Sequence, residues 1–374
     1  MEFSGTVKIT DLNDFLRPSE KCSVHNSMIK TSSKNTAKVS LSDCLACSGC
    51  ITSAESVLLE THSLATLQEK LLQNEIITIS ISQQSLLSIS DRFSMSFDDT
   101  FNKLSQILKK KGVNQVIDMC HARDIVLECC YQEFMIKYQS GNVPILSSEC
   151  PGWLCYALKK GDSKLVNLMS TQKTPMLVQK NIRNIIGYHV VVMPCYDKKL
   201  ESFMEQGVEL VLTTTELMEI CQGFELEECN EVQNNFYSTT KIKTSSMGYA
   251  EYIFTRAVKD IYGEDIEIEP KSTRRRDVYE IEFRDLKFCI ASGFQNIQNI
   301  IRDLKTKKSN YSYIEIMACP MGCLNGGGQL RTTREKIIEL ESSTRNYYKT
   351  STLNTELPSI ERELKLVQGN NLKW

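Results

Sequence analysis

Two cysteines four residues apart, followed by three glycines, form the stretch of this sequence best suited to chemistry. It reads Glu315-Ile-Met-Ala-Cys319-Pro-Met-Gly-Cys323-Leu-Asn-Gly-Gly-Gly-Gln329. The apolar run Tyr313 to Met317 predicts a strand, so both thiols would emerge at its carboxyl end, where open α/β sheets place ligands. Glycines 326–328 permit positive φ and close backbone approach, which a bulky inorganic group would use. The pair alone fits a glycine-rich turn with buried thiols equally well.

Two further cysteines repeat the pattern of an apolar run that ends at a thiol. Cys195 ends Val190-Val-Val-Met-Pro-Cys195, and Cys150 ends Val143-Pro-Ile-Leu-Ser-Ser-Glu-Cys150. Three strand ends would thus deliver four thiols, which is the ligand number of a 4Fe-4S cluster. This count favours a metal cluster over unrelated thiols.

These segments resemble, in order, the three cluster-binding signatures of the iron-only hydrogenase superfamily. The matching sequences are Ser-Glu-Cys-Pro-Gly-Trp, Met-Pro-Cys-x-x-Lys-x-x-Glu and Glu-x-Met-Ala-Cys-x-x-Gly-Cys-x-x-Gly-Gly-Gly-Gln. The resemblance runs over most of the chain and implies two α/β lobes that enclose a cluster. It also implies the ligands of that 4Fe-4S cluster, which are Cys150, Cys195, Cys319 and Cys323.

In the hydrogenases, the last of these cysteines also bridges to a two-iron subsite, and a lysine matched here by Lys198 hydrogen-bonds ligands of that subsite. In this chain Lys198 could instead neutralise cluster charge or begin a helix. Met193 and Met317 match methionines that pack around the active cluster. Core packing at strand ends explains both methionines equally well.

Glu149 departs from the enzyme pattern. Catalytic members usually carry a proton-donating cysteine at the matching position, whereas this chain has a carboxylate. Burial could raise the pKa of Glu149 and let it relay protons, so an active iron-only hydrogenase stays the alternative. We assign no catalytic residue and expect a non-enzymatic protein. The whole chain best resembles the Nar-type branch, hydrogenase-like proteins that act in cytosolic iron-sulfur protein assembly.

A second cluster is expected near the N-terminus. Cys44, Cys47 and Cys50 have the tight spacing by which a loop binds a cubane cluster, and Cys22 upstream is the candidate fourth ligand. No Cys-Pro follows nearby, so the segment differs from the usual two-cluster ferredoxin module. Four thiolates would also suit zinc, which is the alternative here. The expected cofactors are therefore two 4Fe-4S clusters.

Composition limits the other possibilities. The formal net charge of −2 gives no basic footprint for nucleic acid. We expect no membrane span and no signal peptide, hence a cytoplasmic protein, with the nucleus as a further possibility. Fifteen cysteines in a reducing compartment indicate metal rather than disulfides. The other seven are predicted to be packing residues: Cys120, Cys129, Cys130, Cys155, Cys221, Cys229 and Cys289.

The order of motifs predicts a division into four parts. Residues 1–70 would form a small ferredoxin-like cluster segment, 71–206 the first α/β lobe, 207–330 the second, and 331–374 a helical C-terminal segment. Apolar runs predict strands at 76–81, 113–119, 143–146, 188–193, 208–212, 286–291 and 313–317. Helical stripes lie at 100–111 and 297–304.

The resemblance also implies partners. Assembly factors of this branch work with an upstream scaffold, a WD-repeat targeting complex and apoprotein clients. Several such proteins end in a hydrophobic, acidic, aromatic tripeptide that the targeting complex reads. This sequence ends Leu372-Lys373-Trp374, with Lys373 at the usual acidic position. Trp374 is thus either a recognition anchor or a residue docked on its own lobe.

Overall fold

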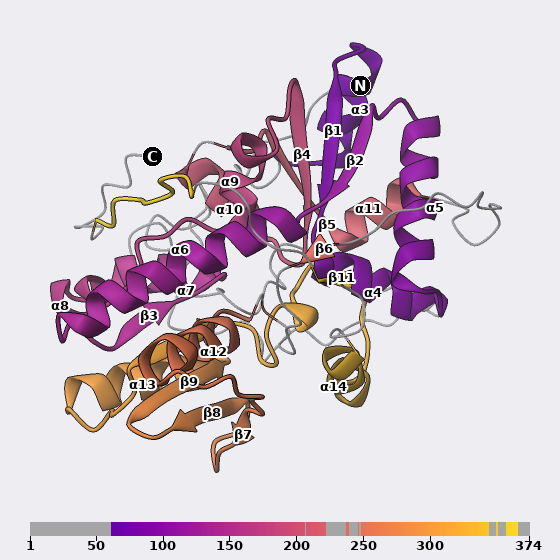
Figure 1. The fold of residues 1–374 in the computed structure, drawn as a ribbon. Helices are drawn as coiled ribbons and strands as arrows, with labels where there is room; N and C mark the ends of the chain where they lie inside the picture. Colours follow the sequence, from indigo (N-terminus) through magenta and orange to yellow (C-terminus); the bar gives the residue numbers. More distant parts are fainter. Residues whose placement is uncertain are drawn as a thin grey trace, which may run out of the picture.

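The computed structural model describes residues 61–205, 207–221, 237–238, 246, 248–343, 349–350 and 357–365. Within them the chain forms two main sheets with helices around and between them (Figure 1). The fold is therefore α/β, as predicted. The expected N-terminal cluster segment, with Cys22, Cys44, Cys47 and Cys50, and the terminal Trp374 lie outside the described residues.

The first sheet is wholly parallel and has the strand order β2-β1-β4-β5. Helices α4 (Gln83–Phe93), α5 (Phe97–Lys110) and α11 (Thr214–Ile220) contribute to the apolar core on one face, and α9 (Pro175–Ile182) packs on the other. Because both faces are covered, the strands read as nearly continuous apolar runs. Their bounds are β1 (Ile77–Ile81), β2 (Gln115–Asp118), β4 (Tyr188–Met193) and β5 (Leu210–Thr213).

The second sheet is mixed and has the order β3-β10-β9-β8-β7. The first three strands are parallel, whereas β8 and β7 are antiparallel. Phe288 on β9 lies at the centre of an aromatic core with Phe134 and Tyr313, at ring-centroid distances of 5.1 and 5.0 Å. The bounds are β3 (Ile145–Ser147), β7 (Lys271–Ser272), β8 (Val278–Phe283), β9 (Leu286–Ser292) and β10 (Tyr313–Met317).

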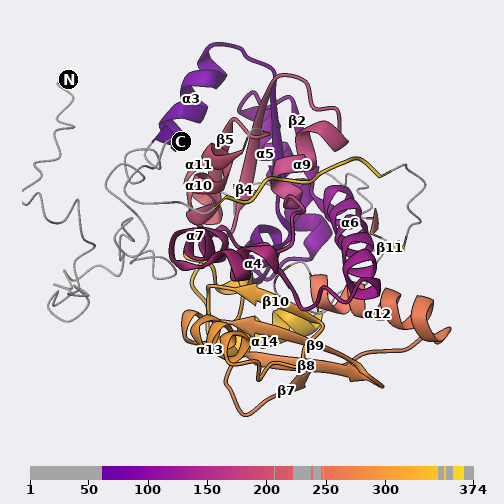
Figure 2. The same cartoon turned by 90° about the vertical axis from the view of Figure 1, so that its left-hand side faces the viewer.

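Helix α6 (Cys120–Gln139) leaves the first sheet after β2 and leads to β3 in the second. It lies between the two sheets and packs with α12 against the second (Figures 1 and 2). The other helices are α3 (Leu64–Leu72), α4 (Gln83–Phe93), α5 (Phe97–Lys110), α7 (Pro151–Lys160), α8 (Ser163–Asn167), α9 (Pro175–Ile182), α10 (Asp197–Met204), α11 (Thr214–Ile220), α12 (Tyr249–Tyr262), α13 (Phe294–Lys305) and α14 (Arg334–Ser343), with a short 3-10 turn η4 (Cys323–Asn325).

The predicted break near residue 206 does not match the division of the strands between the sheets. Strand β3 precedes this point but pairs with β10 in the second sheet, and β5 follows it but pairs with β4 in the first. Ile145 and Leu146 of β3 are buried against the second sheet, so β3 gains its core contacts there. The chain therefore crosses between the sheets more than once.

The C-terminal segment contains helix α14 and then a strap, residues 357–365, that runs back over the body. Ile360 is buried, and its carbonyl accepts a hydrogen bond from the Lys173 amide at 3.0 Å. The Arg362 amide donates to the Thr171 carbonyl at 2.8 Å. A short parallel pair, β6 (Tyr237–Ser238) with β11 (Lys349–Thr350), completes the described strands. No helix in the described part of the chain has the length and apolar character needed to cross a membrane.

Candidate metal centre

The four predicted cysteines lie at the carboxyl ends of three strands from both sheets. Cys150 follows β3 and is the N-cap residue of α7. Cys195 follows β4, and both Cys319 and Cys323 follow β10. Strands β3 and β10 are neighbours in the second sheet, whereas β4 belongs to the first. The thiols can therefore meet only where loops from the two sheets meet.

Hydrogen bonds and electrostatic contacts show that these loops do meet. The Ala318 amide donates to the Cys150 sulfur at 3.5 Å, and the Gly328 amide donates to the Pro194 carbonyl at 2.9 Å. Burial raises the pKa of Cys195 well above its usual range, and its neighbours add to this rise: Asp197, Cys319, Cys150 and Cys323. The structure thus brings the four sulfurs into one neighbourhood.

The four thiols differ in access. Cys150 and Cys195 are buried, whereas Cys319 and Cys323 are partly exposed. Burial raises the pKa of Cys150 to about 11, so the thiol is protonated at neutral pH. Metal binding requires thiolates and therefore releases protons here. The 319–323 loop is the side from which a cluster could be reached.

Among the residues that the structure describes, no three His, Cys, Asp or Glu side chains converge closely enough to hold a single metal ion. A single zinc ion needs all its ligand atoms at one point. A cubane cluster takes one thiolate at each of its irons, so its ligands stand further apart than those of a single zinc ion. The spacing of the described side chains therefore suits a cluster better than one zinc ion.

The glycines of the 326–328 run serve close packing against protein rather than positive φ. A Cβ at Gly326 would lie 2.3 Å from the Pro194 carbonyl oxygen, and one at Gly328 would lie 2.7 Å from the Thr213 side chain. Positive φ occurs earlier in the loop, at Met321 (63°) and Gly322 (76°). None of the three glycines uses the positive φ that glycine permits, whereas the close backbone approach is confirmed at Gly326 and Gly328.

A buried group of charges lies beside Cys150. The Lys198 ammonium donates to Glu149 Oε1 at 2.6 Å and to Glu201 Oε2 at 2.7 Å. Tyr249 donates its hydroxyl to the other Glu149 oxygen at 2.9 Å. Burial by itself lowers the pKa of Lys198, but Glu149 and Glu201 reverse this and raise it. Lys198 is therefore a charged residue held by two carboxylates.

Several members of this site had no recognisable signal in the sequence. Tyr249 lies 100 residues from its partner Glu149. Thr174, which donates to Glu201 at 2.9 Å, begins α9 as its N-cap residue. Each is an ordinary residue in its local context, and only the folded chain places it here.

Glu315 on β10 is a second buried carboxylate near the loop. It accepts hydrogen bonds from the Ala250 amide at 2.8 Å and from the Ser246 hydroxyl at 3.1 Å. The first of these partners lies in the first turn of α12. Burial raises the pKa of Glu315 from about 4.5 to about 8. Glu315 thus ties the start of α12 to the strand that leads into the cysteine loop.

The remaining residues singled out in the sequence belong to the core. Met193 and Met317 are both buried in apolar clusters. Six of the seven other cysteines are buried, as expected of packing residues, namely Cys120, Cys129, Cys130, Cys155, Cys221 and Cys289. Cys229 lies outside the described residues. His189 is a buried strand residue that shares a hydrogen bond of 2.7 Å with Ser80.

Comparison with known sequences places the chain in a family. The family described as the C-terminal domain of the iron-only hydrogenase large subunit matches residues 75–327. Protein NAR1 of Arabidopsis thaliana is 36% identical, over 95% of this chain and 90% of its own length. The cytosolic Fe-S cluster assembly factor narfl of Xenopus tropicalis is 32% identical, over 99% and 93%. The chain therefore belongs to the iron-only hydrogenase-like family, in the branch that contains the NAR1 proteins.

Solved structures show the same fold. A variant of the FeFe-hydrogenase of Chlamydomonas reinhardtii superposes with a TM-score of 0.63 at 18% identity, covering 75% of this chain and 88% of that one. At this identity the likeness concerns the fold alone.

Substitution of one loop glycine should separate close packing from backbone freedom. In Gly326→Ala the new methyl group would clash with the Pro194 carbonyl, so we expect the free energy of unfolding to fall by about 1–3 kcal/mol. Gly327→Ala is the matched control, because its Cβ has no neighbour closer than 3.9 Å. Denaturant unfolding measures both. Equal losses in the two variants would contradict the packing role of Gly326.

Glu315 should make stability depend on pH. Its folded pKa of about 8 lies above the unfolded value of about 4.5, so the folded state holds an extra proton between these values. Stability therefore falls as pH rises through this window, by at most about 1.4 kcal/mol per pH unit. Glu315→Gln should flatten that slope, whereas Glu335→Gln on the exposed side of α14 should not. An unchanged slope in Glu315→Gln would refute the assignment.

Proposed function

We propose that this protein is a cytosolic iron-sulfur cluster assembly factor that holds a 4Fe-4S cluster with Cys150, Cys195, Cys319 and Cys323. The observation that carries the proposal is the meeting of four thiols from three strand ends of two sheets. The names of the relatives in Arabidopsis and Xenopus, given above, support it.

The chemistry of the donor set fits such a cluster. Four cysteine sulfurs match its ligand number, and the Ala318 amide adds a hydrogen bond to one of them. A bound cluster supplies either one-electron chemistry or an iron-sulfur unit that can be passed on. The chain's own contribution is to hold loops of both sheets together, so cluster binding would add to folding free energy. The partial exposure of Cys319 and Cys323 leaves one side open to a partner.

The wider role is that of an adaptor. A second 4Fe-4S cluster would be bound by Cys22, Cys44, Cys47 and Cys50 in the segment 1–70, outside the described residues. The protein would then act between an upstream scaffold and a WD-repeat targeting complex, for apoprotein clients in the cytoplasm, with the nucleus as a further location. In this proposal the two sheets form the body that keeps the inner cluster in place.

The same site argues for a role other than hydrogen turnover. The residue before Cys150 is the carboxylate Glu149, which is buried and bound by Lys198 and Tyr249. Lys198 in turn is shared with Glu201, so its ammonium is committed to two carboxylates. Breaking a buried ion pair leaves an uncompensated charge and costs about 3–5 kcal/mol. This cost favours Glu149 as a fixed structural partner rather than a mobile proton donor.

Single cysteine variants test the ligand assignment. After anaerobic reconstitution, Cys323→Ala should lose roughly four irons per chain, the content of one cubane. Cys289→Ala is the matched control, because Cys289 is a buried cysteine of the same sheet that packs in the core. Iron and sulfide analysis of both proteins makes the comparison. If Cys289→Ala lost as much iron as Cys323→Ala, the ligand set would be wrong.

Spectroscopy tests the absence of hydrogenase activity. The anaerobically isolated, reduced protein should neither evolve nor consume hydrogen, because Glu149 replaces the proton-donating thiol and is fixed by Lys198. Its infrared spectrum should also lack the cyanide and carbonyl bands of a two-iron subsite. Detection of those bands would falsify the assembly-factor proposal and revive the hydrogenase alternative.

A further inference from the structure

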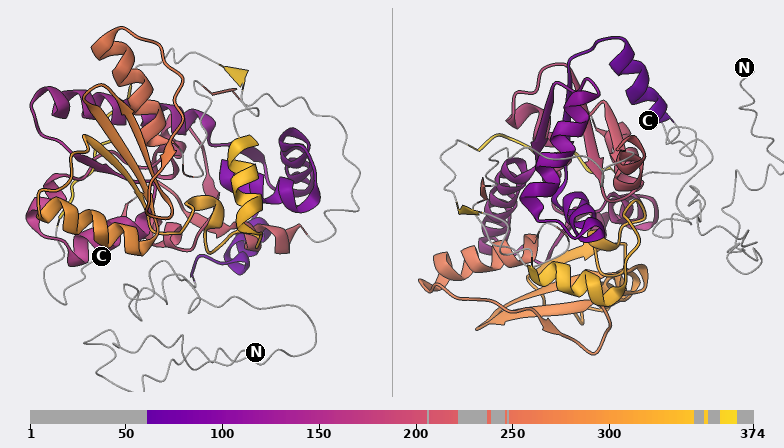
Figure 3. Two further views of the ribbon diagram at one scale, coloured as in Figure 1. Left: turned by 90° about the horizontal axis from the view of Figure 1, so that it is seen from below. Right: turned by 90° about the vertical axis from the view of Figure 1, so that its right-hand side faces the viewer.

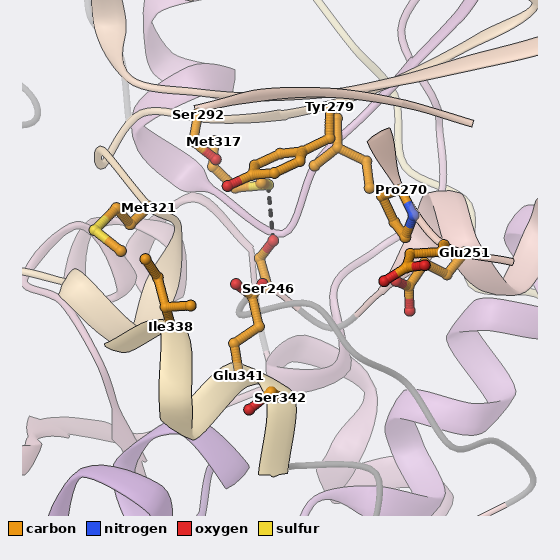
Figure 4. A pocket seen from close by; sticks show the side chains of 12 residues that line it. Ser246, Glu251, Pro270, Tyr279, Ser292, Met317, Met321, Ile338, Glu341 and Ser342 are labelled. Atoms are coloured by element: carbon orange, nitrogen blue, oxygen red, sulfur yellow. Dashed lines mark hydrogen bonds between the residues drawn. The ribbon is translucent and has the colours of Figure 1, made fainter. Parts of the chain in front are cut away.

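A cavity of about 300 Å³ lies between the second sheet and helix α14 (Figure 4), and none of the four cysteines is among its lining residues. Strands β8 and β10 contribute Tyr279 and Met317 on one side, and α14 contributes Ile338 and Glu341 on the other. Ser246 projects between them, and its hydroxyl oxygen lies 2.9 Å from the Met317 sulfur. This volume lies at the lower end of the range of small-molecule sites.

Helix α14 closes the cavity and is fixed on both sides. Ile337 and Leu340 pack into the core of the first sheet. Lys336 forms an ion pair with Asp91 of α4 at 3.3 Å, and Arg334 forms one with Asp277 next to β8. Figure 3 shows the helix between the two parts of the molecule. Since the family match ends at residue 327, this wall of the cavity lies beyond the matched core.

The charged groups among the described lining residues are all carboxylates. Three carboxylates line it, from Glu251, Glu269 and Glu341, and the described lining residues include no Lys, Arg or His. Arg334, the nearby cation on α14, is bound by Asp277. In a partly enclosed site, carboxylates attract a cation more strongly than they do in bulk water.

The other lining residues are mainly apolar. Ile290, Met317, Met321, Ile338 and Pro270 provide a surface that an alkyl chain can cover. The Tyr279 ring adds a face suited to a cation. An apolar stem that ends in a positive charge matches both halves of this lining.

We propose that this cavity binds an organic cation carried on an apolar stem, either a free alkylamine or the lysine or arginine side chain of a bound polypeptide. The site lies beyond the proposed cluster-binding function. Its occupant would contact Met317 and Met321, which flank Cys319 in sequence. The cavity is therefore placed to link ligand binding with the cysteine loop.

The test uses the full chain and three matched probes in calorimetric titrations. The three probes share a similar apolar chain and differ in the charge of the head group. We expect n-hexylammonium to bind at least about tenfold more tightly than n-hexanol. Hexanoate should bind more weakly than n-hexanol, because the lining carboxylates repel it. Binding of n-hexylammonium should weaken as salt is added. Equal or tighter binding of n-hexanol or hexanoate would overturn the proposal, as would the absence of n-hexylammonium binding.

Variants then locate the site. The double variant Glu269→Gln/Glu341→Gln should lower the affinity for n-hexylammonium at least about fivefold, because it removes two of the three lining carboxylates. Glu335→Gln on the same helix but outside the cavity is the control and should bind as the parent does. Both variants should melt as the parent does, since Glu269 is exposed and Glu341 is partly exposed. Unchanged binding in the double variant would refute the site.

Titrations with two peptides distinguish a free alkylamine from the side chain of a bound polypeptide. The probes are acetyl-Leu-Lys-Leu-amide and acetyl-Leu-Gln-Leu-amide. If the lysine peptide binds more tightly than n-hexylammonium and the glutamine peptide does not, the ligand is a polypeptide side chain. If n-hexylammonium binds more tightly than either peptide, the ligand is a free amine. If the two peptides bound equally well, and both more tightly than n-hexylammonium, the proposal that the ligand must carry a positive charge would be overturned.

Discussion

The contact between the loop after β10 and the loop after β4 is the constraint on which the rest of the site depends. The Gly328 amide binds the Pro194 carbonyl, and Gly326 packs so closely on that carbonyl that a methyl group has no room. This contact joins the second sheet to the first next to Cys195. Without it, the cysteines after β10 would have no fixed relation to the one after β4, and four thiols could not act as one ligand set.

The buried charges next to Cys150 are a second constraint on the same junction. Lys198 lies in α10, which follows β4 of the first sheet, while Glu149 follows β3 of the second. Such a pair contributes little net stability once desolvation is counted, but its loss is costly because a charge is left unpaired. The pair therefore does more to fix how the two sheets are positioned relative to each other than to raise the free energy of unfolding. In this way Glu149 also connects the two sheets.

The fold alone does not decide what the protein does. The same architecture supports hydrogenases at 18% identity, so function has to be argued from the residues at the strand ends and from the parts added around them. Helix α14 and the strap around Ile360 lie beyond the family match, yet both pack into the cores of the matched region. They add to the surface around the matched region, and α14 forms one wall of the acidic cavity.

The sequence by itself determined the parallel strands of the two main sheets and the cysteines at the ends of three of them, but not the antiparallel strands β7 and β8. Strands Tyr188–Met193 and Tyr313–Met317 were predicted to the residue, because a strand buried on both faces is a local apolar run. Tertiary structure decided which strands share a sheet, as the placement of β3 and β5 shows. It also decided the partners of Glu149 and the packing role of Gly326. Those outcomes depend on contacts between residues far apart in the chain, and no local pattern encodes them.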